Sequence, residues 1–244
     1  MLRRALTLLA LIGLALPALG QNDGDPAGSV PRVLLTSVEG AIGPATARQI
    51  SDAVATAESR NADALVLQLN TPGGLVTSTR DIIITIMGSG VPVIGYVAPS
   101  GAHAASAGTY ILYATHAAGM APATNIGAAT PIQMGGGSPL PGGGQDQPAG
   151  DEGQDRPQTT DDSPKADPAN DQEALKAKRL NDAVAFIRGL AEARGRNADW
   201  AEAAVRQAAT LTAEAAKEKN VIEAVAGSVP ALLAALDGRV VTVK

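Results

Sequence analysis

The stretch GAHAASAGTYI at residues 101–111 follows closely on the apolar run VPVIGYV at 91–97. A short, continuously apolar run is typical of a strand that is buried on both faces of a sheet. Ser106 comes shortly afterwards, among glycines and alanines that let two backbones approach closely. Two interpretations compete for its hydroxyl group. It belongs either to a tight packing contact that happens to contain a serine, or to a nucleophile that a large substrate must reach.

Two further apolar runs, at 32–38 and 64–69, have the same character. In the connecting segments 44–62 and 75–87, apolar residues recur at helical spacing. Buried strands that alternate with helices predict an α/β fold with mostly parallel strands and flanking helices. The chain has one Phe, one Trp and three Tyr among 244 residues, so we expect a core of alanine and aliphatic side chains.

More helices are expected in the second half of the chain. One should begin around Ala104. The segment 172–197 predicts a long amphipathic helix, because one stripe carries Leu180, Val184, Ile187 and Leu190. A shorter helix, a helix capped by Thr212, a strand at 221–226 and a last helix should follow. The closing segment 239–244 predicts a strand that is cut short, and we expect the natural chain to continue beyond it.

Two regions are expected outside the folded body. Residues 1–20 combine a basic start, an apolar stretch and a small-residue cleavage site, which is the pattern of an export signal. The apolar run is short for a membrane span, although retention as an N-terminal anchor stays open. Residues 21–30 should be a flexible lead. The segment 135–170, rich in Gly, Pro and acidic residues, predicts a disordered loop inside a single domain at 31–244.

Charge and cysteine content exclude several classes of function. Seven acidic and two basic residues give the 135–170 segment a net charge of −5, which equals that of the whole chain. The remaining charges balance without a basic stripe, so we expect no nucleic-acid partner. The chain contains no cysteine. Disulfides and thiolate metal sites are therefore excluded, and the sequence predicts neither a metal nor a cofactor.

Two glycine-rich turns, at 70–74 and 99–106, each follow an expected strand and precede an expected helix. Ligands of parallel α/β sheets bind at the carboxyl ends of the strands, and helix starts offer free backbone N–H groups. The N–H of Ala107 should lie beside the hydroxyl of Ser106, and Gly73 and Gly74 can bring further donors. A nucleophile next to oxyanion donors is the arrangement that acyl transfer requires.

A serine nucleophile needs a base, and the sequence leaves several open. His103 precedes the serine by three residues and His116 follows the expected helix, but a lone histidine is more often a surface residue or a satisfied hydrogen-bonding group. No aspartate is placed to orient either one. A lysine can replace histidine where burial lowers the pKa of an amine. Lys176 and Lys178 are the candidates, and ordinary surface solvation is the alternative for both.

Several motifs in order carry a family resemblance, namely LNTPGG (69–74), GAHAASAGTYI (101–111), NIGAATPI (125–132), KRLNDAVAFIRGLAEARGRN (178–197) and LTAEAAKEKNVIEAV (211–225). Together they resemble the N-terminal domain of NfeD-like membrane-bound serine proteases, relatives of the Clp protease and signal-peptide-peptidase group. The resemblance covers about residues 30–235 apart from the loop. It implies a Clp/crotonase-like spiral of β-β-α units.

The resemblance also implies site residues. The family's serine falls on Ser106 and its lysine on Lys178, with Lys176 in reserve. The oxyanion donors would be the N–H groups of Gly74 and Ala107.

The family's substrates are apolar peptide segments, and its described partner is a stomatin-like membrane protein. The resemblance therefore implies a peptide that pairs with an edge strand at 124–132. The substrate-binding residues would be Gly73, Asn125, Ile126 and Gly127. We further expect a homodimer and an exported, periplasmic or membrane-associated protein.

Two other functions stay open at this point. One is a peptide-binding or scaffold domain of the same fold with impaired catalysis. The other is a crotonase-like acyl-CoA enzyme, which the export signal disfavours because acyl-CoA is a cytoplasmic substrate.

Overall fold

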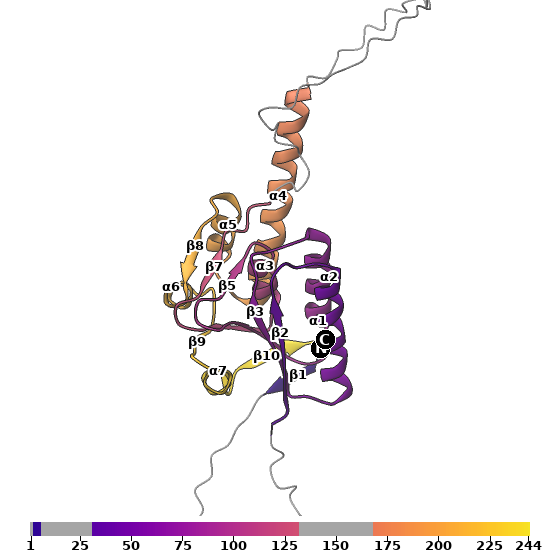
Figure 1. Ribbon diagram of the computed structural model, residues 1–244, viewed down its shortest axis with the longest axis vertical. Coiled ribbons are helices and arrows are strands. Elements are labelled where there is room, and N and C mark those ends of the chain that lie inside the picture. Colours follow the sequence, from indigo (N-terminus) through magenta and orange to yellow (C-terminus); the bar gives the residue numbers. More distant parts are fainter. Residues whose placement is uncertain (1, 6–30, 132–167) are drawn as a thin grey trace, which may run out of the picture.

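The computed structural model describes residues 2–5, 31–131 and 168–244 (Figure 1). The expected flexible lead, most of the expected export signal and most of the expected loop at 135–170 lie outside these residues. The last three residues of that loop segment are helical, because helix α4 begins at Pro168. At the other end of the chain, strand β1 (Leu2–Ala5) pairs antiparallel with β10 (Val240–Val243).

A parallel five-stranded sheet forms the centre of the molecule, in the order β2-β3-β4-β6-β9. Its strands are β2 (Val33–Glu39), β3 (Ala64–Asn70), β4 (Val93–Val97), β6 (Ala117–Met120) and β9 (Ala224–Val225). The first three are the apolar runs from which the fold was predicted. The strand expected at 221–226 is shorter, since only two of its residues pair with β6.

A second sheet has the order β5-β7-β8, with β5 (His103–Ala105), β7 (Asn125–Gly127) and β8 (Thr210–Thr212). Strand β7 is central, paired with β5 on one side and with β8 on the other. The expectation of a free strand edge is therefore wrong for residues 125–127, because both edges of β7 already carry pairing strands. The helix expected around Ala104 begins later for a similar reason, since β5 pairs with β7 and with Thr71.

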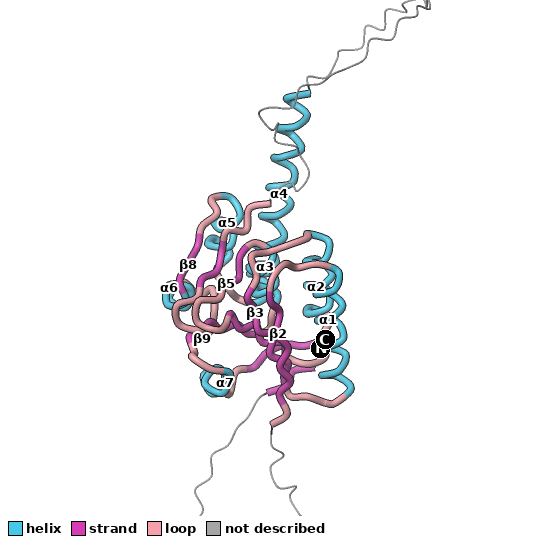
Figure 2. Tube along the Cα trace, in the orientation of Figure 1, coloured by secondary structure: helices cyan, strands magenta, loops and turns pink. Residues whose placement is uncertain are grey.

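The helices are α1 (Pro44–Ser59), α2 (Val76–Met87), α3 (Ala107–Ala114), α4 (Pro168–Arg194), α5 (Ala198–Arg206), α6 (Ala213–Glu218) and α7 (Val229–Leu236). Figures 1 and 2 show that α1 and α2 lie side by side and that the first turns of α4 extend beyond the rest of the structure. Thr212 caps α6 as predicted, accepting a hydrogen bond from the Ala215 N–H at 3.4 Å. Among the described helices, none is long and apolar enough to cross a membrane.

The chain twice runs from a strand of the central sheet to a strand of the second sheet and then to a helix, in β4-β5-α3 and in β6-β7-α4. The predicted α/β class with mostly parallel strands and flanking helices is thus confirmed. The larger core cluster lies on one face of the central sheet and includes the buried α4 residues Val184, Ile187 and Leu190. A smaller cluster on the other face is covered by α7 through Leu232 and Leu236.

Three basic side chains lie where α3 ends and β6 begins. Arg196, whose side chain is 1% exposed, donates to the carbonyls of Leu112 and Tyr113 and pairs with Glu223 at 3.0 Å. His116 is buried, and its Nδ1 accepts a hydrogen bond from the Val93 N–H at 3.1 Å. Burial, reinforced by Arg194 and then Arg196, lowers the pKa of His116 to about 3. His116 is therefore held neutral in the folded protein.

This histidine should make stability depend on pH. The pKa of His116 is lower in the folded protein than in the unfolded chain, where it is about 6.5. The neutral histidine therefore contributes to folding stability above about pH 6.5, and this contribution is lost as the pH falls toward the folded-state pKa. From about pH 7.5 to about pH 5.5, His116 should cost the protein about 1.4 kcal/mol of unfolding free energy. His116→Asn keeps an acceptor for the Val93 N–H but cannot titrate. Urea unfolding at both pH values should show a smaller pH dependence in the variant; an equal dependence would contradict the assignment.

Candidate active site

Ser106 occupies a sharp turn between strand β5 and helix α3, where it is the N-cap residue of the helix. Its backbone angles, φ 50° and ψ −114°, are strained for a residue with a side chain. The Ser106 N–H donates to the Gly127 carbonyl at 3.0 Å, which ties the turn to β7. A serine on a strained turn from strand to helix presents its hydroxyl outward, as nucleophilic serines on such turns do.

The glycine turn after β3 packs directly against this serine. A β-carbon on Gly73, whose φ is +117°, would lie 2.7 Å from the Ser106 Cβ and 3.1 Å from its Oγ. A β-carbon on Gly74 would overlap the backbone of Ile42. Only glycine fits at either position, so the absence of side chains is what brings the turn to the serine.

Two backbone N–H groups remain available beside the hydroxyl. Within the described structure, neither Gly74 nor Ala107 donates its N–H to any acceptor, whereas the Gly73 N–H is held by the Thr71 hydroxyl at 3.1 Å. Ala107 is the first residue of α3, where N–H groups have no partner inside the helix. Gly74, Ser106 and Ala107 line one pocket. These free donors beside a hydroxyl can stabilise an oxyanion.

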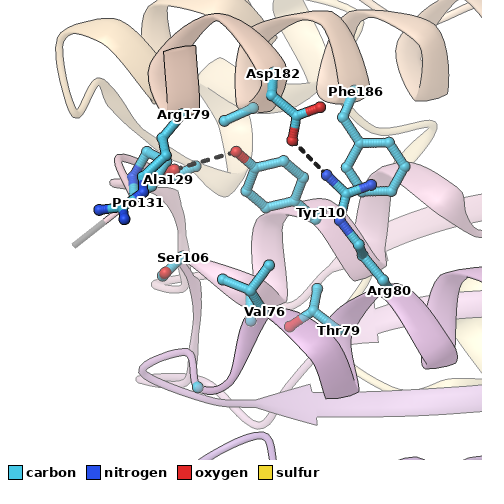
Figure 3. A pocket seen from close by; sticks show the side chains of 13 residues that line it. Val76, Thr79, Arg80, Ser106, Tyr110, Ala129, Pro131, Arg179, Asp182 and Phe186 are labelled. Atoms are coloured by element: carbon cyan, nitrogen blue, oxygen red, sulfur yellow. Dashed lines mark hydrogen bonds and ion pairs between the residues drawn. The ribbon is translucent and has the colours of Figure 1, made fainter. Parts of the chain in front are cut away.

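The pocket has a volume of about 590 Å³ and opens between α2, α3 and α4 (Figure 3). It is lined by Gly74, Val76, Thr79, Arg80, Ser106, Ala107, Tyr110, Ala129, Pro131, Arg179, Asp182, Ala183 and Phe186. Apolar and aromatic side chains form much of the wall, and three charged side chains lie among them. The mixture suits a ligand with apolar side chains and a polar backbone.

An aromatic and charged cluster forms the wall that faces α2 and α4. The Tyr110 and Phe186 rings stack with centroids 6.0 Å apart, and the Tyr110 hydroxyl donates to the Ala129 carbonyl at 3.3 Å. Burial raises the pKa of Tyr110 well above its usual value, so the hydroxyl stays protonated. Arg80 pairs with Asp182 at 2.6 Å and lies 4.4 Å from the centre of the Phe186 ring.

The structure does not join the predicted lysine to the serine. Lys176 and Lys178 are exposed, neither lines the pocket, and neither side chain forms a hydrogen bond within the described residues. The Ser106 hydroxyl has no partner there either. Lys178 directly precedes Arg179, about 100° away around the helix, and Arg179 does line the pocket. The Ser106–Lys178 dyad therefore stays a prediction.

Neither histidine lines the pocket. His116 is buried at the start of β6, with its Nδ1 already used by Val93. His103 lies in β5, where its backbone pairs with Asn125 of β7. Among the described residues, no group of three or more His, Cys, Asp or Glu side chains could hold a metal ion.

The predicted substrate-binding residues occupy different environments. Gly73 contacts Ser106, as described above. Ile126 is fully buried, and the Gly127 carbonyl accepts from both the Ser106 N–H and the Thr109 hydroxyl. Asn125 is exposed at the start of β7. Since residues 125–127 have no free strand edge, contact of these residues with a substrate stays a prediction.

Sequence reasoning missed most of the pocket wall. On α4, the residues that face the pocket are Arg179, Asp182, Ala183 and Phe186, which are spaced like one face of a helix. On α2, the wall comes from Val76, Thr79 and Arg80, directly after the glycine turn. Arg179 and Asp182 form a polar stripe beside the predicted apolar stripe of α4. This polar stripe was the signal that could have revealed the α4 part of the pocket wall.

Comparison with known proteins gives concordant matches. A family model for the N-terminal domain of NfeD1b matches residues 32–139. The membrane-bound protease PH1510 of Pyrococcus horikoshii is 34% identical over 238 residues, which is 98% of this chain and 45% of that protein. The membrane protein NfeD1b of Bacillus subtilis is 34% identical over 122 residues, covering 50% of this chain and 25% of that protein.

Two similar solved structures are of 1510-N, described as a membrane-bound stomatin-specific protease. A serine-to-alanine mutant has a TM-score of 0.70 and 32% identity, covering 87% of this chain and 88% of that one. A lysine-to-alanine mutant in complex with a substrate peptide has a TM-score of 0.68 and 33% identity, covering 88% of this chain and 84% of that one. This chain spans less than half the length of the curated relatives. It belongs to the family of NfeD-like membrane-bound proteases and corresponds to their N-terminal domain.

Proposed function

We propose that this domain is a serine endopeptidase with Ser106 as its nucleophile. The observation that carries the proposal is the strained turn at Ser106, which sets the hydroxyl beside two free backbone N–H groups in one pocket. These groups, on Gly74 and Ala107, form the oxyanion hole. Preorganised donors of this kind stabilise the charge that develops on a peptide carbonyl oxygen during attack.

In the proposed reaction, the Ser106 Oγ attacks the carbonyl carbon of the peptide and gives its proton to the amine of Lys178. The carbonyl oxygen becomes the oxyanion held by the two N–H groups. The C–N bond then breaks, and Lys178 returns the proton to the leaving amine. Water attacks the acyl-enzyme ester by the same route, which frees the carboxylate product and restores the Ser106 hydroxyl.

The assignment of Lys178 as the base rests on the family motif and on the position of α4. This helix forms one wall of the pocket through residues that directly follow Lys178. For the mechanism, the Lys178 side chain must turn from solvent toward Ser106 and come within hydrogen-bond reach of the hydroxyl. Lys176 is the reserve candidate, two residues earlier on the same helix.

The proposed substrate is an extended peptide with apolar side chains. Val76, Tyr110, Ala183 and Phe186 supply apolar surface around the nucleophile. The 1510-N relatives are described as specific for stomatin, which supports a stomatin-like membrane protein as the partner of this chain. We extend the proposal to a homodimer, and to an exported domain held in the periplasm or at the membrane.

Removal of the nucleophile or the base should abolish cleavage. Ser106→Ala and Lys178→Ala should each lower kcat for an apolar peptide by at least about a thousandfold. Lys176→Ala serves as the matched control and should retain most activity. Circular dichroism of all three variants should match the wild type, because these side chains are not part of the core. Full turnover in Ser106→Ala would remove the serine from the mechanism, and a loss confined to Lys176→Ala would exchange the two lysines.

The approach of Gly73 to the serine offers a second test. Gly73→Ala would drive a β-carbon against Ser106, so it should abolish activity and lower the unfolding free energy by about 1–3 kcal/mol. Gly101→Ala is a matched control, since Gly101 also has a positive φ, +89°, but has no atom within reach of a new β-carbon. Peptidase assays with denaturant unfolding should show activity retained in Gly101→Ala alone. An active Gly73→Ala protein would contradict the proposed geometry.

A second candidate function is a peptide-binding domain of the same fold with impaired catalysis. The exposure of Lys176 and Lys178, and their absence from the pocket wall, favour it. A fluorophosphonate probe, which reacts covalently with activated serine hydroxyls, separates the two functions. Labelling that is lost in Ser106→Ala would support the peptidase. Unlabelled protein that still binds an apolar peptide in calorimetry would support the binding domain.

A further inference from the structure

Helix α4 is attached to the body unevenly along its length. The side chains from Glu173 to Lys178 are exposed and do not line the pocket, and the first turns of α4 stand away from the body in Figure 1. Leu180 is the first residue to pack against the core, and Ala183 is the first buried one. Whatever fixes α4 near residues 180–183 therefore decides where the preceding turn, with Lys178, stands relative to Ser106.

Arg80 of α2 contacts this part of α4 at the pocket wall. Its guanidinium pairs with the Asp182 carboxylate at 2.6 Å and lies over the Phe186 ring at 4.4 Å from the ring centre. Both partners project from the α4 face that lines the pocket, one turn apart (Figure 3). Phe186 in turn stacks on Tyr110 of α3. Arg80 thus connects α2 with α4, and through Phe186 with the helix that begins beside Ser106.

We propose that Arg80 is a positioning residue, which holds α4 over the pocket so that Lys178 can reach the Ser106 hydroxyl. Asp182 lies four residues after Lys178, so one helical turn separates the anchored carboxylate from the base. Arg80 itself touches neither the proton nor the scissile bond. The inference rests on the proposed peptidase function and adds to it a residue that the sequence motifs did not include.

The exposure of the ion pair separates positioning from folding. The Arg80 and Asp182 side chains are 42% and 68% exposed, and pairs so exposed contribute little to folding stability. The Arg80–Asp182 pair nevertheless restrains the local position of α4, and the cation–π contact between Arg80 and Phe186 adds to this restraint. Loss of Arg80 should therefore lower kcat about five- to thirtyfold, which corresponds to about 1–2 kcal/mol at the barrier. The melting temperature should change little.

Kinetics of the wild type and three variants test the proposal. Arg80→Ala should lower kcat five- to thirtyfold while KM changes less than about threefold, because the loss falls on the geometry of the reacting groups. The double variant Arg80→Asp with Asp182→Arg restores opposite charges and should recover kcat above that of Arg80→Ala. Asn181→Ala is the matched control, because Asn181 neighbours Asp182 and its side-chain oxygen accepts a hydrogen bond from Arg206 of α5 at 3.4 Å. It should retain wild-type kinetics. Unchanged kcat in Arg80→Ala, or an equal loss in Asn181→Ala, would overturn the proposal.

A distance measurement tests positioning without any need for activity. The chain has no cysteine, so the exposed residues Ile84 on α2 and Leu175 on α4 can be replaced by cysteine and spin-labelled. The distribution of distances between the labels should broaden in Arg80→Ala and keep its width in Asn181→Ala. An unchanged distribution would overturn the positioning role. A fully active Ser106→Ala protein would refute the proposed peptidase instead, and the spin-label result would still decide whether Arg80 positions α4.

Discussion

The close approach of Gly73 to Ser106 is the constraint on which the rest of the site depends. A β-carbon at position 73 would lie within 3.1 Å of both side-chain heavy atoms of the serine, so the glycine turn and the serine turn are in direct contact. Each turn is also fixed from its other side, through Ile42 for the glycine turn and Gly127 for the serine turn. These contacts hold the two turns together. The free N–H groups of Gly74 and Ala107 therefore lie in one pocket.

This arrangement explains why a strained serine persists. A non-glycine residue at φ 50° is costly unless surrounding contacts compensate for it. Here the Ser106 N–H donates to the Gly127 carbonyl, and the single hydroxyl proton of Thr109 has that carbonyl and the Ala104 carbonyl within reach, each 2.9 Å from the oxygen. The strain is thus supported by β7, a strand with neighbours on both sides. Residues 125–127 have no free edge for a peptide, and the strand that they form accepts the hydrogen bond of the Ser106 N–H through Gly127.

The parts that could be predicted from the sequence are those that local pattern determines. Continuous apolar runs gave β2, β3 and β4, and the small residues at 73, 74, 106 and 107 indicated a close backbone contact that the structure confirms. The three-residue strands β5 and β7 leave no periodicity to detect. The Arg80–Asp182 pair joins residues 102 positions apart, so no local pattern marks it.

The two halves of the proposed machinery differ in how they are held. The oxyanion side consists of backbone groups in the glycine turn, which bridges to Ile42, and at the start of α3, while the base is a long side chain on the exposed part of α4. A peptide that fills the pocket would contact both halves, and it would also exclude water from the serine, which strengthens every charge interaction there. In the proposed enzyme, substrate binding would therefore complete a site whose oxyanion half is already in place. The anchor of α4 would decide how far Lys178 has to move.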